Sequence, residues 1–191
     1  MRALDGYEEV NFTAAGRDLM MIEPRILVAG VGNIFLGDDA FGSEVARVLL
    51  GRPQPPEVKV VDFGIRGFDL TYALLAEYEL TILVDATPRG EPPGTLYIIE
   101  PNLDELDELS PQEAMVDTHN MNPLRVLAVA KSMGAKLKRI LVVGCEPAPI
   151  DLDGEGEMGL SEPVQQTVIS AVEKIESLIE QTLTGAANGT G

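Results

Sequence analysis

Three polar residues that lie far apart in the chain have side chains able to act together on a metal ion or on a peptide bond. Asp39 follows the glycine-rich segment 30–33, Asp85 follows the apolar run 80–84, and His119 is the only histidine. Two carboxylates and one imidazole suit a first-row divalent metal that keeps open coordination positions. If the fold brings these groups together, we expect a protein that holds a metal or cleaves a bond with its help.

Strands and helices that alternate along the chain are expected to position these residues. Short apolar runs predict buried strands, and apolar residues at helical spacing predict helices. The strands are expected over 25–29, 58–61, 80–84, 95–100 and 139–144, and the helices over 40–50, over 67–79, between Asn122 and Gly134, and from Ser161 onward. This alternation predicts an α/β fold with a mostly parallel sheet that helices cover on both faces.

The helical periodicity also predicts which side chains face the sheet. In the helix over 67–79 they are Phe68, Leu74, Leu75 and Tyr78, and in the last helix they are Val164, Val168, Ala171, Val172, Ile175 and Ile179.

The carboxyl ends of the strands are where such a sheet builds its ligand sites. Asp39 follows the first strand, Asp85 ends the third, and His119 lies in the loop before the helix that leads to the fifth. We therefore predict all three side chains at the same edge of the sheet.

The chain is expected to contain one folded domain over residues 25–183. Residues 1–24 have no sustained periodicity and predict an N-terminal extension, and residues 184–191 predict a frayed C-terminal tail. The formal net charge of −17 argues against nucleic acid and anionic membrane surfaces as partners. One cysteine, no signal-peptide pattern and no apolar stretch of about 20 residues favour the cytoplasm. We expect a monomer.

The glycine-rich segment and the aspartates near it have other interpretations, and so has Asp85. The glycines of segment 30–33 suggest a dinucleotide fingerprint with Asp62 as its ribose-binding acid, but Phe35 stands where a small residue is needed, so a tight turn is the simpler explanation. Asp38 or Asp39 could cap the helix that follows. One aspartate is enough for a cap, which leaves the other for chemistry. Asp85 could instead bind loop amides.

Three further residues have competing interpretations. His119 could simply be an exposed loop histidine. Cys145 could be a nucleophile paired with that histidine, but a free cysteine usually behaves as a small buried hydrophobe. Arg66 could contact an anion or a peptide in the crevice, although such an arginine is more often solvated.

The motifs around these residues resemble the hydrogenase maturation endopeptidases. The matching strings are ILVAGVGN at 26–33, GDDAFG at 37–42, Val84-Asp85-Ala86 and Asp117-Thr118-His119, and the resemblance extends from Arg25 to about Ile179. It implies a single three-layer αβα domain with a five-stranded twisted sheet, in agreement with the pattern of elements above.

The resemblance also implies a metal-contacting and catalytic set, which falls on Asp39, Asp85 and His119. Many relatives have glutamate at the first position. The chain departs from a GxQP pattern of the family, since Gly144 and Cys145 are followed by Glu146 and Pro147, and segment 62–64 lacks the usual double glycine. These departures suggest a divergent subgroup with its own hydrogenase partner.

The implied activity is a protein-processing hydrolase. It is an endopeptidase that removes a short C-terminal peptide from the nickel-loaded precursor of a nickel–iron hydrogenase large subunit, and so activates that enzyme. The nickel belongs to the precursor, and the free protease could hold another divalent metal at the same ligands. A metal would polarise the scissile carbonyl or activate water.

Two alternatives stay open at this point. In an aspartic-type mechanism Asp39 and Asp85 would share a proton and activate water directly. Alternatively, the chain could be a non-catalytic chaperone or binding module that holds a metal-loaded precursor without cutting it.

Overall fold

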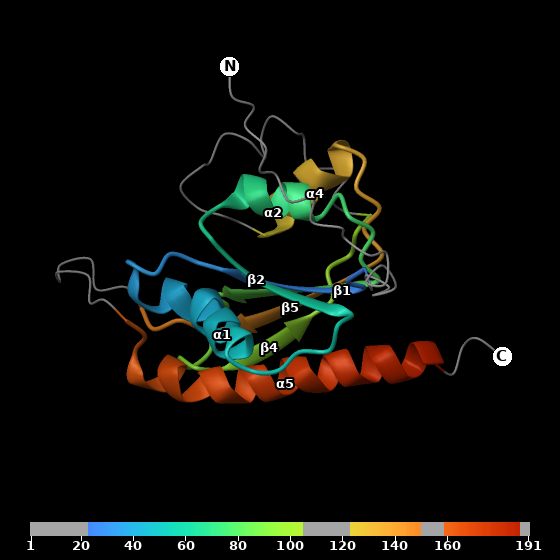
Figure 1. Cartoon of the computed structure of the whole chain (residues 1–191). Coiled ribbons are helices and arrows are strands. Elements are labelled where there is room, and N and C mark those ends of the chain that lie inside the picture. Colours follow the sequence, from blue (N-terminus) through green and yellow to red (C-terminus); the bar gives the residue numbers. More distant parts are fainter. Residues whose placement is uncertain (1–22, 105–122, 150–158, 188–191) are drawn as a thin grey trace, which may run out of the picture.

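The computed structural model describes residues 23–104, 123–149 and 159–187. Strands and helices alternate along these segments, as the apolar patterns predict (Figure 1). In chain order the elements are β1 (Ile26–Val31), the 3-10 helix η1 (Gly37–Ala40), α1 (Phe41–Leu50), β2 (Val58–Gly64), α2 (Gly67–Ala73), β3 (Leu80–Ala86), β4 (Leu96–Ile99), α4 (Pro123–Ser132), β5 (Arg139–Cys145) and α5 (Glu162–Ala187).

The five strands form one sheet in the order β2-β1-β3-β5-β4. β1, β2, β3 and β5 are parallel, and β4 pairs antiparallel with β5 at one margin of the sheet. The carboxyl ends of the four parallel strands therefore lie along one edge. This arrangement confirms the predicted α/β class and the mostly parallel five-stranded sheet.

The helices form the two outer layers (Figure 1). α1 and α5 cover one face of the sheet, and α2 and α4 cover the other. Successive residues of a strand point to opposite faces, so Ile26 and Val28 pack in the α1–α5 layer while Leu27 and Ala29 pack in the α2–α4 layer. Strands buried on both faces need continuous apolar runs, which explains the sequence of β1.

Two details of the helices differ from the prediction. α2 ends at Ala73 rather than near residue 79, and turns follow it. Phe68, which was predicted to face the sheet, is exposed. Leu75 is also partly exposed, whereas Leu74 and Tyr78 are buried as predicted. All six predicted inward residues of α5 are buried.

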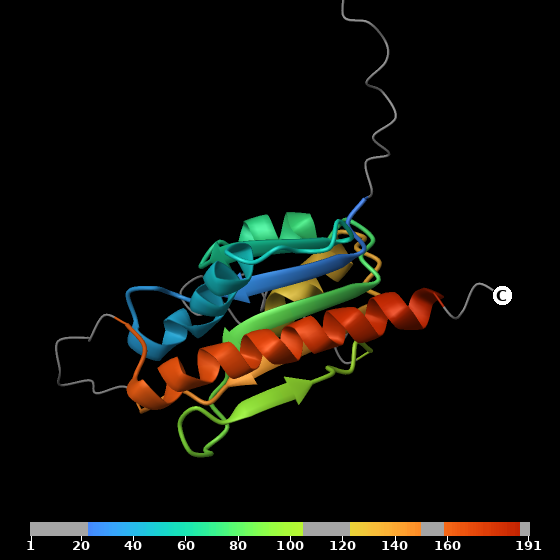
Figure 2. The same ribbon diagram turned by 60° about the horizontal axis from the view of Figure 1, so that its bottom comes forward.

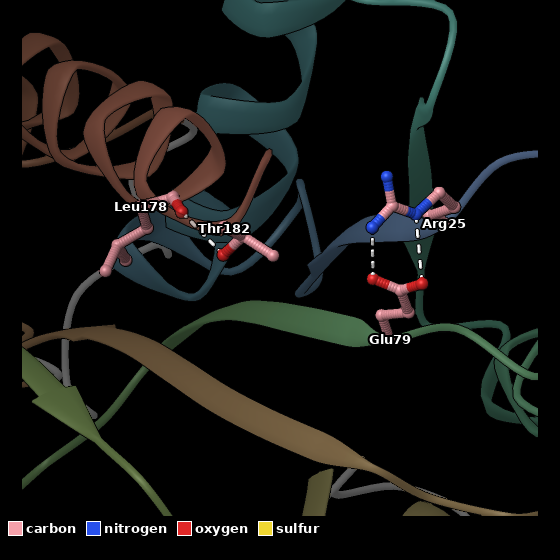
Figure 3. Close-up of polar contacts among 4 residues, drawn as sticks. All are labelled: Arg25, Glu79, Leu178 and Thr182. Carbon is pink, nitrogen blue, oxygen red and sulfur yellow. Dashed lines mark hydrogen bonds and ion pairs between the residues drawn. The ribbon is translucent and has the colours of Figure 1, made fainter. Parts of the chain in front are cut away.

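The C-terminal helix is longer than predicted. α5 continues to Ala187, past the expected end of the domain at residue 183. Thr182 stays within the helix, where its hydroxyl donates to the carbonyl of Leu178 at 2.8 Å (Figure 3). The Thr184 hydroxyl likewise donates to the carbonyl of Glu180 at 2.7 Å. The expected extension at residues 1–24 falls outside the described residues except for its last two positions.

An ion pair joins the starts of β1 and β3, at the edge of the sheet opposite the carboxyl ends of the parallel strands. The Nε and Nη2 atoms of Arg25, just before β1, donate to the two carboxylate oxygens of Glu79, just before β3, at 3.0 and 2.6 Å (Figure 3). The Glu79 amide also donates to the Arg25 carbonyl at 2.8 Å. These contacts fix the start of two neighbouring strands. Among the described helices, none is long and apolar enough to span a bilayer.

Candidate active site at the carboxyl edge of the sheet

Three glycines let the start of α1 pack directly against the ends of two strands. A Cβ atom on Gly42 would lie 2.1 Å from the carbonyl oxygens of both Val31 and Val84, at the ends of β1 and β3. One on Gly30 would lie 2.4 Å from the Gly42 carbonyl. Gly32 has a φ of +140°, and its Cβ would meet the Asp39 carbonyl at 1.8 Å. The glycines of this motif therefore serve close backbone packing.

Asp39 is held at this junction by its own loop. Its Oδ2 atom accepts the backbone N–H of Asn33 at 2.7 Å, and its backbone N–H donates to the Leu36 carbonyl at 3.0 Å. Figure 2 shows the β1 arrow pointing toward this loop and η1. The side chain is half-buried. Among the described residues, Oδ2 is the carboxylate oxygen of Asp39 that has a hydrogen-bond donor.

Asp85 lies inside β3, one residue before its end, and only 8 % of the residue is exposed. Burial raises the pKa of its carboxyl well above the ordinary value, and the negative charge of Asp39 raises the pKa further, against a smaller opposing effect of the Ala86 backbone N–H. The two carboxyls are therefore close enough to couple electrostatically. Such a pair attracts a cation or shares a proton, and both properties are typical of catalytic sites.

The third predicted member, His119, lies outside the described residues. Within residues 23–104, 123–149 and 159–187, no group of three or more histidine, cysteine, aspartate or glutamate side chains is arranged to hold a metal ion. The fold thus brings together Asp39 and Asp85, two of the three predicted residues. Two adjacent carboxylates fit a divalent cation in charge and donor type, and a complete ligand set needs a further donor.

Asp38 has a structural task that differs from capping its own helix. Its buried carboxylate accepts the backbone N–H groups of Ala148 and Ser161 at 2.8 and 2.6 Å, and the Ser161 hydroxyl at 2.8 Å. It therefore joins η1 to the segment after β5 and to the start of α5. Asp38 thus makes these structural contacts, and a chemical role for Asp39 stays a prediction.

The remaining candidates of the sequence have ordinary partners. Asp62 accepts the Ser43 hydroxyl at 2.8 Å and the Gly64 N–H at 3.0 Å, so its carboxylate is engaged within the protein rather than open to a ribose. Arg66 donates to the carbonyls of Asp62 and Phe63 and pairs with Asp69 at 3.5 Å, with its side chain largely exposed. It fixes the turn after β2.

Cys145 is fully buried at the end of β5. Burial, together with the negative charges of Asp38 and Glu146, raises the pKa of its thiol to about 12. A thiol with such a pKa is not ionised at neutral pH and cannot act as a nucleophile. The cysteine is a small core residue, which was the simpler of its two predicted interpretations.

Glu146 is a site residue for which the sequence offered only the departure from the GxQP pattern. Its buried carboxylate accepts the backbone N–H groups of Arg89 and Gly90 at 2.8 to 3.0 Å and the Tyr97 hydroxyl at 2.5 Å. The Arg89 guanidinium lies 5.3 Å from the centre of the Tyr97 ring. Glu146 therefore anchors the loop after Ala86, next to Asp85, to the end of β5.

The Glu146 anchor makes a pH-dependent contribution to stability. The Tyr97 hydroxyl and then the backbone N–H donors lower the pKa of the Glu146 carboxyl below its unfolded value, so its contribution is present above about pH 4.3 and is lost as pH falls through the folded pKa. We expect Glu146→Gln to lower the midpoint of thermal unfolding by a few degrees at pH 7, and the deficit to narrow below about pH 4.

The matched control for this change is Glu91→Gln, which removes the same charge from an exposed side chain of the same loop. Thermal unfolding followed by circular dichroism from pH 3 to pH 8 measures both variants. A deficit of Glu146→Gln that does not change with pH would contradict the assignment.

Comparisons with known proteins show which family and which folds this chain resembles. The model of the hydrogenase maturation protease family matches residues 43–178. The hydrogenase expression/formation protein HupD of Rhizobium leguminosarum is 31 % identical over 151 residues, which cover 78 % of this chain and 71 % of that protein. The maturating endopeptidase HybD of Escherichia coli is 27 % identical with a TM-score of 0.64, covering 83 % of this chain and 93 % of HybD. A hydrogenase 2 maturation peptidase from a Thaumarchaeota archaeon is 31 % identical with a TM-score of 0.62, covering 82 % and 98 %.

Proposed function

The chain belongs to the hydrogenase maturation protease family, and we propose that it removes a short C-terminal peptide from the nickel-loaded precursor of a nickel–iron hydrogenase large subunit. The family and the fold identify a peptidase that acts in hydrogenase processing. The C-terminal cleavage and the use of nickel are the part that we propose. The observation that carries it is that the parallel pairing of β1 and β3 brings the buried Asp85 and the half-buried Asp39 to the same carboxyl edge of the sheet.

The two carboxyls are suited to complementary roles. Asp39 is half-buried beside η1 and can accept a proton from an attacking water. Asp85 has a raised pKa, so it can hold a proton nearer to neutral pH and deliver it to the leaving amine. His119 stays the predicted third residue. The nickel of the precursor supplies polarisation of the scissile carbonyl or of a bound water when it is present.

The same pair supports recognition of a metal-bearing substrate. Like charges held close together in a partly buried site repel each other, and a cation placed between them offsets that repulsion. A precursor that carries its nickel therefore gains binding free energy at this site that an empty precursor does not. We place this step in the cytoplasm, because the chain has a single cysteine.

Mass spectrometry of the precursor before and after incubation with the protein tests the proposal. We expect the precursor to lose the mass of one short C-terminal peptide, with the new C-terminus located by peptide sequencing. A precursor of unchanged mass in a stable complex would instead identify a binding module. A precursor of unchanged mass that forms no complex would contradict both the peptidase and the binding module.

A further inference from the structure

Large apolar side chains are exposed to solvent beside the candidate site. Two segments carry them: the loop between β1 and η1, and the turn after β2 with the outer side of α2. We call these residues the apolar rim, and they are Ile34, Phe35, Leu36, Ile65, Phe68 and Tyr72, each 49–66 % exposed. Contiguous exposed apolar side chains on a folded protein mark interaction surfaces more often than chance exposure does.

The loop that carries the first three rim residues is fixed by hydrogen bonds. The Phe35 N–H donates to the Asn33 side-chain oxygen and the Leu36 N–H to the Asn33 carbonyl, both at 3.0 Å. The Asn33 N–H in turn donates to the Asp39 carboxylate at 2.7 Å. A loop built in this way holds its apolar side chains outward. Their exposure is therefore a property of the fold, and it is tied to the position of Asp39.

The second segment is fixed next to the first. The Gly32 N–H donates to the Gly64 carbonyl at 3.1 Å, which joins the ends of β1 and β2. The Arg66 N–H donates to the Phe63 carbonyl at 2.9 Å, which closes the turn before α2. Phe68 and Tyr72 are four residues apart and share the outer side of that helix. Both segments therefore border the same edge of the sheet.

We propose that the apolar rim is the docking surface for the folded body of the large-subunit precursor, which covers it with an apolar patch beside its C-terminal tail. This inference rests on the proposed function. The rim is continuous with the loop of Asp39, so a protein that brings a peptide bond to Asp39 and Asp85 must lie over it. The net charge of −17 opposes docking of an acidic protein through charge, whereas apolar burial does not depend on charge.

The chain offers a matched pair of leucines for the test. Leu36 in the rim and Leu50 at the far end of α1 are 55 % and 56 % exposed. A glutamate at either position leaves the core untouched, and Phe68→Glu probes the second segment. We expect Leu36→Glu and Phe68→Glu to raise the KM for nickel-loaded precursor by about 10-fold or more, and Leu50→Glu to leave KM and kcat unchanged.

The dissociation constant gives a second readout. It is measured in an Asp85→Asn background, so that the precursor stays uncut. We expect the rim variants to increase the dissociation constant for the nickel-loaded precursor. For the protein without a rim substitution, the dissociation constant should not increase from low to high salt. If the parent protein cleaves the precursor and both rim variants have the KM of the parent protein, the docking surface is contradicted and the proposed function stays in place. A change of oligomeric state at unchanged KM would assign the rim to a second copy of the chain. Failure of the parent protein to bind or cut the precursor would overturn the proposed function and this inference with it.

Discussion

Replacing Asp85 with asparagine should abolish cleavage of the precursor and leave the chain at least as stable as the parent protein at pH 7. Asparagine keeps the shape of the side chain but can neither hold nor release a proton. Loss of a catalytic acid–base group typically lowers the rate by about 10²–10⁴-fold. Because burial and the charge of Asp39 disfavour the ionised form of Asp85, a neutral side chain removes an unfavourable interaction from the folded state.

The pH dependence of stability separates this role from a structural one. The folded pKa of Asp85 is raised, so its contribution to stability is present below the unfolded pKa of about 3.9 and is lost as pH rises through the folded value. Asp85→Asn lacks this titration, and its stability should fall less than that of the parent protein as pH rises from about 4. Urea unfolding at several pH values measures the difference.

Two further variants complete the test of the pair. Asp39→Asn should also abolish processing, and it should reduce the pH dependence that Asp85 imposes on stability, because the neighbouring charge is gone. Asp104→Asn changes an exposed aspartate and should leave processing and stability unchanged. Normal processing by Asp39→Asn and Asp85→Asn would end the assignment of the carboxyl pair.

The position of this pair could be predicted because it depends on local patterns and one general rule. Apolar runs identify the strands, parallel strands share a carboxyl edge, Asp85 follows one such run directly, and Asp39 follows another after a short loop. His119 was predicted at the same edge from its loop, and it lies outside the described residues. The order of the strands in the sheet did not have to be known for this argument.

The supporting contacts could not be predicted, since each joins residues that no local pattern relates. Asp38 holds Ser161, 123 positions away, and Glu146 holds Arg89, 57 positions away. Apolar periodicity alone continued α2 past Ala73 and placed Phe68 on the inner side, whereas Phe68 is exposed. Gly42 reads as an ordinary helix residue until its contact with two strand ends is seen.

These contacts explain why the glycines and aspartates of segment 30–42 stand so close together in the sequence. Gly32 and Gly42 bring α1 against β1 and β3, and Asp38 fastens η1 to the start of α5. Asp39, which stands between Asp38 and Ala40, is therefore held in place by contacts of its neighbours and of its own carboxylate. A carboxylate with restricted motion loses little entropy when it binds a cation or a substrate, so its binding free energy is larger.

Nickel-free precursor should not be cleaved, and addition of nickel to that precursor should restore cleavage. The physical reason is the repulsion between Asp39 and Asp85: a cation carried by the substrate offsets it, whereas an apo precursor leaves it in place. Mass spectrometry of apo, nickel-loaded and zinc-loaded precursor incubated with the protein measures the effect, and the zinc form controls for charge alone. His119→Ala should likewise prevent cleavage of the nickel form if its imidazole completes the site. Efficient cleavage of apo precursor in strong chelator, with an acidic optimum, would contradict nickel recognition and would support an aspartic-type mechanism in which Asp39 and Asp85 share one proton and activate water themselves.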